Sequence, residues 1–318
     1  IGHFLAIHGK DPIYYAFVYL LSNSGFVNAS GYVFTSVFVS YFLILGSTVR
    51  AARLLGICAD KIFLAILILL YFDPLFSNSA HLLRQFLAGA VVLFALSRST
   101  QDSKETWLLT IAASLIHSSA TVFILVLLVR RFLGGRKLRN TILRLCCVIV
   151  ALFMLRFAPG PITMVSSALG LDFISYAISR LSQESFFELQ PLSAGSLVYV
   201  IILAAASFLS TFRLSAEKAH LSSPDRFTEP TLLISMTIIF SHFIGFDEIS
   251  VRYLIYLYIL SGVIMAIFLS RFCGPVMLVS MALSPCIPII FILELNTGAW
   301  TYASGWQLAF GSFYSFIE

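Results

Sequence analysis

The sequence has few charged residues for its length. Of its 318 residues, 11% are Asp, Glu, Lys or Arg, whereas 59% are hydrophobic. A globular domain of this length could not hide so much apolar surface in one core, so the composition indicates a polytopic membrane protein. Long polar blocks that would form a separate soluble domain are also lacking, and we therefore treat residues 1–318 as a single membrane domain. The net charge of +5 is too small to indicate nucleic-acid binding.

The chain also lacks the motifs of enzymes that use soluble cofactors. It contains no Walker loop, no dinucleotide glycine fingerprint, no HExxH and no Cys/His cluster with metal-ligand spacing. Its five cysteines show no disulfide framework, and we interpret them as small apolar residues in or near spans. We therefore expect neither a metal nor a cofactor. The chain begins with Ile rather than Met, which leads us to expect a preceding segment such as a first span or signal anchor.

Apolar stretches recur along the chain and predict an all-α integral membrane protein with about eight full transmembrane helices. Arg50, Arg53 and Lys61 lie between the first two spans and would face the cytoplasm under the positive-inside tendency. The remaining spans then alternate in direction. The eight spans are expected at 31–49, 62–76, 82–97, 140–158, 193–212, 231–246, 251–270 and 274–293.

Three further segments are expected to lie outside these spans. Residues 1–30 are too polar at their start to cross the membrane, and they predict an interfacial segment with a short helix anchored by tyrosines. Residues 159–192 predict an external segment with an amphipathic stretch suited to the membrane surface. Residues 294–318 form an outer tail rich in aromatic residues. The anchoring tyrosines are Tyr14, Tyr15 and Tyr19.

The uncharged stretch from Thr106 to Val129 allows two interpretations. As one helix its 24 residues would reach about 36 Å, enough for a single tilted span. That crossing would export six basic residues in one short loop, against the positive-inside tendency. A re-entrant helical hairpin that breaks at His117 removes the conflict, and we favour it over a single span with inverted downstream topology. The six basic residues are Arg130, Arg131, Arg136, Lys137, Arg139 and Arg144.

The hairpin topology places several unusual polar residues at the outer face. Arg84 and Gln85 begin an apolar helix there, so the guanidinium and the helix N-terminus would together favour an anion such as a phosphate. Alternatively, Arg84 snorkels to lipid headgroups or pairs with Asp73. Asp11, Asp73 and His81 are secondary candidates at the same face.

His117 and the segment around Asp247 supply candidates for proton transfer. A neutral imidazole at His117 could accept a proton from a hydroxyl or donate to a phosphate oxygen, unless it only bonds between helices. His242 is a second histidine candidate. One carboxylate of the Asp247-Glu248 pair could neutralise Arg252 and the other could act as a base, although an ordinary solvated loop explains the same residues.

Four short elements in this order resemble the EpsG-like branch of the Wzy polysaccharide polymerases. The match extends from about Asp11 to Tyr256, whereas no clear family element follows Tyr256. The elements are Asp11-Pro12-Ile13-Tyr14, Arg84-Gln85-Phe86-Leu87-Ala88, Leu115-Ile116-His117-Ser118-Ser119-Ala120 and Val251-Arg252-Tyr253-Leu254-Ile255-Tyr256.

The resemblance implies a glycosyltransferase of the bacterial inner membrane, with a GT-C-like fold as one possibility and an active site facing outward. Its substrates would be two undecaprenyl-diphosphate-linked oligosaccharides, one as donor and one as acceptor, and a flippase and a chain-length regulator would be its partners. In such a reaction Arg84, Gln85 and Arg252 would bind the diphosphate. His117 is our first choice for the base, and Asp247 or Glu248 the second.

Two other classes of membrane protein fit parts of the sequence. A lipid-glycan flippase or transporter also has many spans, but internal repeats are typical of transporters and none is visible here. A membrane O-acyltransferase would use an intramembrane histidine, but it leaves the two outer arginines without a task. The product, whether O antigen, capsule or exopolysaccharide, is not determined by these residues.

Overall fold

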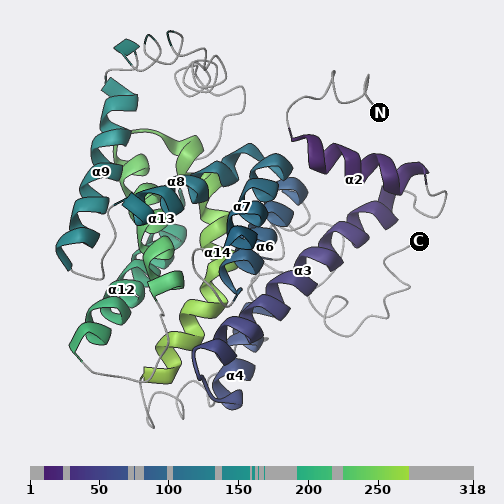
Figure 1. The fold of residues 1–318 in the computed structure, drawn as a ribbon, viewed down its shortest axis with the longest axis horizontal. Helices are drawn as coiled ribbons and strands as arrows, with labels where there is room; N and C mark the ends of the chain where they lie inside the picture. The colour runs from purple at the N-terminus through teal and green to yellow at the C-terminus, as the bar shows by residue number, and fades with distance from the viewer. Residues whose placement is uncertain are drawn as a thin grey trace.

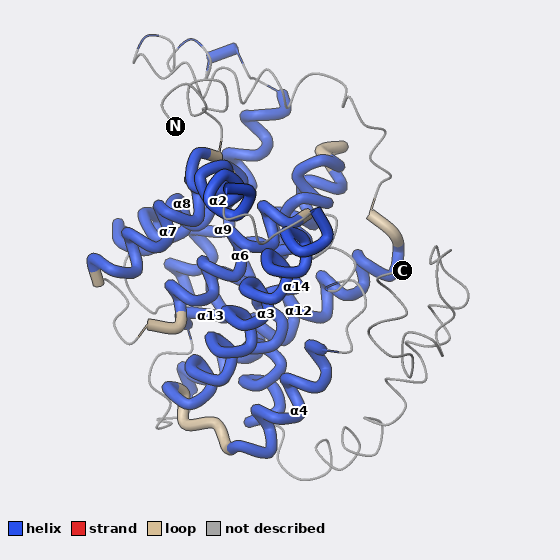
Figure 2. Tube along the Cα trace, turned by 90° about the vertical axis from the view of Figure 1, so that its right-hand side faces the viewer, coloured by secondary structure: helices blue, strands red, loops and turns tan. Residues whose placement is uncertain are grey.

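Every regular element that the structure describes is a helix (Figures 1 and 2). This computed structural model describes residues 11–23, 29–70, 75, 82–98, 103–132, 138–157, 160–161, 164, 168, 192–216 and 225–271. The all-α prediction is confirmed for this part of the chain. The helices are α2 (Pro12–Asn23), α3 (Ala29–Leu54), α4 (Ala59–Leu70), α6 (Leu83–Leu96), α7 (Lys104–Ile116), the 3-10 turn η1 (Ser118–Ala120), α8 (Thr121–Phe132), α9 (Leu138–Phe157), α12 (Ala194–Ala216), α13 (Asp225–Phe243) and α14 (Asp247–Arg271).

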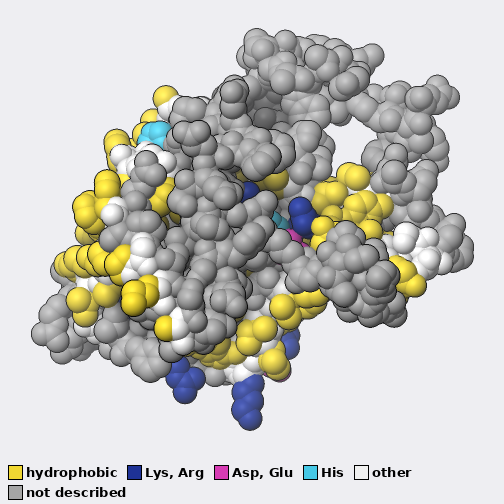
Figure 3. All heavy atoms as spheres, turned by 90° about the horizontal axis from the view of Figure 1, so that it is seen from above, with side chains coloured by type: hydrophobic (Ala, Val, Ile, Leu, Met, Phe, Trp, Pro, Cys, Tyr) yellow, Lys and Arg dark blue, Asp and Glu magenta, His cyan; other side chains and the backbone are white. Residues whose placement is uncertain are grey.

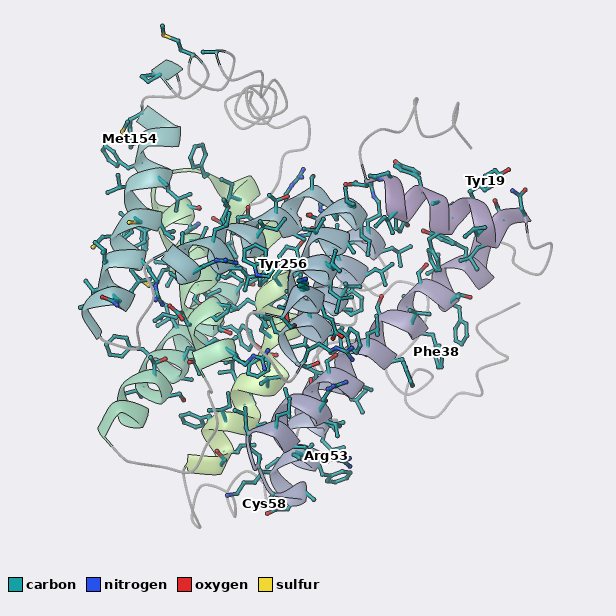
Figure 4. The ribbon with its side chains drawn as sticks, in the orientation of Figure 1. Tyr19, Phe38, Arg53, Cys58, Met154 and Tyr256 are labelled. Atoms are coloured by element: carbon teal, nitrogen blue, oxygen red, sulfur yellow. The ribbon has the colours of Figure 1, made fainter. Side chains whose placement is uncertain are left out.

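The apolar lengths of these helices fit a protein that crosses a membrane several times. Gly31–Leu54, Ala194–Thr211 and Ile249–Ser270 are long and apolar enough to span by themselves, and shorter apolar helices accompany them. The large apolar side chain of Phe38 points away from the bundle (Figure 4), and Phe42 of the same helix is also exposed, as expected for a surface that faces lipid. Seven of the predicted spans coincide with described helices, although α4 is described only to Leu70. The span at 274–293, most of the external segment 159–192 and the tail 294–318 lie outside the described residues.

The stretch from Thr106 to Val129 is broken where the sequence predicts a break. Helix α7 ends at Ile116, His117 is extended with φ −152° and ψ 125°, and η1 leads into α8. The arms are about 20 Å and 18 Å long at 1.5 Å per residue, shorter than the hydrocarbon core. The interpretation of this stretch as one straight helix is therefore wrong. The chain instead forms two short helices, α7 and α8, that are separated by the break at His117.

Helix α14 is the central element of the bundle, between α12 and α13 on one side and α3, α4 and α6 on the other (Figure 1). Its residues from Ile255 to Leu260 are buried all round, which is typical of a helix in the core of a bundle. Close packing against α6 depends on Gly89. A Cβ at this position would overlap Cδ1 of Ile259 and lie 3.2 Å from Cδ1 of Tyr256.

Polar contacts between helices define two ends of the bundle. At one end, which we call the site end, Gln85 of α6 donates a hydrogen bond to the backbone oxygen of Arg252 in α14, so both helices begin there. At the opposite end, Lys61 Nζ lies 3.4 Å from the backbone oxygen of Ser270, and α4 therefore begins where α14 finishes. Arg53 lies at this opposite end in Figure 4.

A buried ion pair joins α9 to α13. Arg144 pairs with Glu229, and both side chains are almost fully buried. The pair lies in the second turn of each helix, whereas Leu152 further along α9 packs against Phe246 just after α13. The two helices thus run in the same direction. Arg144, one of the six basic residues that a single span would export, therefore lies inside α9 rather than in a loop, and its charge is neutralised by Glu229.

One predicted helix boundary and one predicted contact are corrected by the packing. Helix α13 begins at Asp225 rather than near 231, and it continues through Pro230, because its polar first turns are buried against α9 and α12. Helix α2 forms as predicted, but Tyr14 does not anchor it at the membrane interface. The Tyr14 side chain is only 8% exposed, and its hydroxyl hydrogen-bonds to Tyr32 of α3.

Candidate functional site

Asp11 joins three segments that are far apart in the sequence. One carboxylate oxygen lies 3.0 Å from Nη1 of Arg84, and the other accepts a hydrogen bond of 3.0 Å from the backbone N–H of Ser118. The Asp11 side chain is 3% exposed. Its φ of +61° lies in the left-handed region, which is unfavourable for most residues but tolerated by Asp. These contacts hold the start of α2, the start of α6 and the turn after α7 in one place.

Arg84 is anchored through a single nitrogen. Its Nη1 bonds to Asp11 and, at 3.3 Å, to the hydroxyl of Tyr15. The guanidinium carbon lies 5.8 Å from the ring centroids of both Tyr14 and Tyr15, within the range of a cation–π contact. Within the described part of the chain, the Nε–Nη2 edge makes no hydrogen bond, and the side chain is 42% exposed. Arg84 is thus held in place with its forked edge available.

The N-terminus of α6 adds to this positive region. Leu82 occupies the N-cap position, and no side chain caps the helix there. The first backbone N–H groups of a helix have no acceptor within it, and the helix dipole adds a partial positive charge. Because Arg84 stands in this first turn, the guanidinium and the helix start can bind the same anion.

His117 lies in a hydrogen-bonded turn beside this arrangement. Its Nδ1 accepts a hydrogen bond of 3.2 Å from the backbone N–H of Ser119 and lies 2.7 Å from the Ser119 hydroxyl. That hydroxyl also lies 2.7 Å from the hydroxyl of Tyr256, a buried residue at the centre of the bundle (Figure 4). The imidazole is therefore held from α14 as well as by its own turn.

The start of α14 is tied to α6 next to this turn. Gln85 is buried and bonds to the backbone of Arg252, while the Arg252 side chain is exposed. A second arginine therefore lies at the same end as Arg84. It is in the second turn of its helix, because α14 begins at Asp247 rather than near 251 as the sequence predicts. Near the middle of the face in Figure 3, basic, acidic and histidine side chains lie together between hydrophobic ones.

The other predicted candidates are placed less completely. His242 is in the last turn of α13, with its ring centroid 5.7 Å from that of Phe243. Asp247 and Glu248 form the first turn of α14, about one turn before Arg252, and only their backbone is described. Asp73 and His81 lie outside the described residues. No group of three or more His, Cys, Asp or Glu side chains suited to a metal is found among the described residues.

The sequence did not reveal several partners in this site. The sequence predicts the nearby Asp73 as a partner of Arg84, whereas the described partner is Asp11, 73 residues away. Nor does the sequence predict a site role for Tyr15, Ser118 or Ser119. The sequence nevertheless contains a feature that could have indicated these three residues, because each lies in or beside one of the short elements that carry the family resemblance.

Fold and site together define a multi-pass helical membrane protein with an anchored arginine and a histidine at one end. A profile described as the EpsG family matches residues 2–304, and the chain belongs to this family. The EpsG family is one of membrane polymerases of the glycosyltransferase type, which act on lipid-linked sugars. No curated protein and no solved structure matches the chain.

Proposed function

We propose that this protein polymerises a surface polysaccharide from undecaprenyl-diphosphate-linked repeat units. It transfers the growing glycan of one lipid diphosphate to a sugar hydroxyl of the next lipid-linked repeat unit. The observation that carries this proposal is Arg84, whose Nη1 is fixed by Asp11 while its Nε–Nη2 edge makes no hydrogen bond to the described residues. A planar donor fork of this kind suits two oxygens of a phosphate.

The proposed orientation puts the site end at the outer face of a bacterial inner membrane. Arg50, Arg53 and Lys61 support this orientation, because they lie around the turn between α3 and α4 at the opposite end, and basic residues concentrate on the cytoplasmic side. About eight full spans in a GT-C-like arrangement, with α7 and α8 as a re-entrant hairpin, complete the proposed topology. Flipped lipid-linked units would then reach the site from a flippase, and a chain-length regulator would act from outside.

The proposed reaction breaks the bond between the anomeric carbon and a phosphate oxygen of the donor. The bonding electrons pass to that oxygen, a new bond forms from the anomeric carbon to the acceptor oxygen, and the acceptor hydroxyl loses its proton to a base. Negative charge grows on the diphosphate as the bond breaks. Arg84 and Arg252 stabilise this charge without proton transfer, and Gln85 holds the two helix starts together.

Attack from the face opposite the leaving diphosphate makes this a single inverting step. The acceptor would lie on one side of the anomeric carbon and the arginines on the other. The linkage in the polymer should therefore have the opposite anomeric configuration to the donor's phosphate linkage. Retention, measured by NMR of donor and product, would contradict a single displacement.

Gene deletion and complementation test the proposed activity against its rivals. Deletion should shorten the surface glycan to single repeat units, visible as loss of the ladder on a gel. Loss of all repeat units from the surface would instead indicate a flippase, and an unchanged ladder with altered acylation would indicate an O-acyltransferase.

Three substitutions then test the site in the complemented strain. Arg84→Ala, Arg252→Ala and His117→Ala should each remove most of the ladder at normal protein levels. Arg98→Ala is the matched control, because Arg98 uses its Nε and Nη2 to bind Glu105 at the other end of α6. Normal ladders from all three site variants would refute the assignment.

A further inference from the structure

The hydrogen bonds around His117 fix which of its nitrogens carries the proton. A backbone N–H can only donate, so the bond from Ser119 N at 3.2 Å requires a lone pair on Nδ1 of His117. A neutral imidazole carries one proton, and with Nδ1 as the acceptor that proton is on Nε2. An imidazolium would direct a second N–H from Nδ1 against the N–H of Ser119, which is unfavourable.

The neighbouring hydroxyl groups are compatible with the same assignment. Ser119 Oγ lies 2.7 Å from Nδ1 and 2.7 Å from the Tyr256 hydroxyl. The Tyr256 hydroxyl can donate to Ser119 Oγ, which then donates toward Nδ1. Tyr256 cannot move away easily, because its ring packs edge-on against Phe123 at 5.3 Å and lies beside Gly89. With Nδ1 as the acceptor, both the backbone N–H and the hydroxyl of Ser119 donate to the unprotonated nitrogen.

Asp11 sets where this histidine stands relative to Arg84. The carboxylate that holds Nη1 of Arg84 also holds the N–H of Ser118, the residue after His117. The turn and the guanidinium are therefore attached to one buried group. An anion held by Arg84 would lie at the same end of the bundle as the imidazole.

We propose that His117 acts as a neutral hydrogen-bond donor through Nε2–H, to an oxygen of the departing lipid diphosphate. It does not take the proton of the acceptor hydroxyl. As the anomeric carbon–oxygen bond breaks, the electron pair stays on the phosphate oxygen, and the bond from Nε2–H strengthens without proton transfer. Proton acceptance is left to a carboxylate, for which Asp247 and Glu248 are the candidates. This inference rests on the proposed polymerase activity.

Nitrogen NMR measures the tautomer without reference to activity. The purified full chain is labelled with ¹⁵N-histidine in nanodiscs at a pH about one unit above the usual histidine pKa of about 6.5. The His117 signals are identified by their loss in His117→Gln. We expect an unprotonated Nδ1 and a protonated Nε2, and a change at Nε2 when undecaprenyl diphosphate is added. A protonated Nδ1, or an Nε2 signal that the added lipid leaves unchanged, would overturn the inference.

Two amide substitutions test the same assignment in the reaction. The Gln side chain places its NH₂ close to the position of Nε2–H, whereas the shorter Asn side chain reaches only the position of Nδ1. Conversion of lipid-linked repeat units in membranes should fall by about tenfold or less in His117→Gln, but by about 10²–10³-fold in His117→Asn and His117→Ala, the usual cost of losing one such donor. Equal loss in Gln and Ala variants that fold normally would favour a base and contradict the proposal.

The two experiments separate this inference from the proposed function. If Arg84→Ala removes polymerisation but Nδ1 is protonated, the polymerase assignment stands and the role of His117 is wrong. If polymerisation survives both Arg84→Ala and Arg252→Ala, the proposed site fails whatever the tautomer. Ser119→Ala provides a further control, since it keeps the backbone N–H and should retain the Nε2–H tautomer.

Discussion

Among the described residues, two arginine–carboxylate pairs join segments that are far apart in the sequence, and the two arginines differ in their exposure. Arg84 pairs with Asp11 at the site end, and their side chains are 42% and 3% exposed. Arg144 pairs with Glu229 between α9 and α13, where the side chains are 4% and 6% exposed. Each pair joins segments far apart in the sequence. Only the first leaves its arginine accessible.

The difference in burial gives the two pairs different roles. When both charges are buried, each one needs its partner, because an isolated charge in a low-dielectric interior is costly. The Arg144–Glu229 pair therefore fixes the register of two helices. At the site end the carboxylate alone is buried, and it uses both oxygens to hold its partners. Asp11 thereby presents Arg84 toward the outside of the bundle.

Breaking the buried pair should have the largest effect on stability. Glu229→Gln leaves Arg144 without its counter-charge, and we expect a loss of about 3–5 kcal/mol in the free energy of unfolding. The measurement is thermal unfolding of the purified protein, together with its amount in membranes. The double variant Arg144→Met/Glu229→Gln should recover most of this loss. A Glu229→Gln protein as stable as the wild type would show that the pair does not hold the helices.

Removing the exposed arginine should instead affect activity. Arg84→Ala is expected to lower repeat-unit transfer by about 10²–10³-fold, the usual cost of a lost transition-state donor. Arg84→Ala also leaves the buried Asp11 carboxylate without its counter-charge, so its unfolding temperature should fall below that of Arg98→Ala, which loses an arginine at the opposite end. The fall should be smaller than in Glu229→Gln, because the N–H of Ser118 still bonds to Asp11. If Arg84→Ala lowered stability as much as Glu229→Gln, both pairs would be structural and the comparison would fail.

Changing Asp11 should give an intermediate loss of activity. Asn tolerates the left-handed backbone and keeps one acceptor oxygen, so Asp11→Asn should retain part of the hydrogen bonding around Arg84. We expect the transfer rate to fall about tenfold, which corresponds to the loss of one hydrogen bond to a charged group. Asp11→Ala loses both acceptors and disfavours φ +61°, so it should lose more. The measurement compares the transfer rates of the Asp11→Asn and Asp11→Ala proteins in membranes at matched protein levels. Equal rates for Asn and Ala would mean that Asp11 does not position Arg84.

The smallest expected effect concerns the close approach of α6 and α14. Gly89→Ala adds a methyl group against Ile259 and Tyr256, and overpacking of this kind costs about 1–3 kcal/mol. Gly46→Ala is the matched control, because a Cβ there meets nothing within 4 Å; it should raise helix stability by up to about 1 kcal/mol. Thermal unfolding of both variants tests the difference. Equal stabilities would contradict the tight contact that holds Tyr256 beside Ser119.

The sequence predicted local features of this protein better than its long-range pairs. Hydropathy located most helices, and the charge pattern around Thr106 to Val129 predicted the break at His117 because a run of basic residues constrains topology. The partnership of Asp11 with Arg84 was not predictable in this way, since nothing in a single sequence links positions 73 residues apart. The sequence does not predict that α13 begins at Asp225, because charged residues such as Arg226 and Glu229 are typical of a loop. Only the fold brings Arg144 to the Glu229 carboxylate and neutralises it.

The central claim is that Arg84 holds a lipid diphosphate, and a binding measurement tests it most directly. Purified wild type, Arg84→Ala and Arg98→Ala in nanodiscs are titrated with undecaprenyl diphosphate. We expect Arg84→Ala to bind at least about tenfold more weakly, since a hydrogen bond to a charged group contributes about 1.5–3 kcal/mol, and Arg98→Ala to bind like the wild type. Equal affinity for all three proteins would contradict the account.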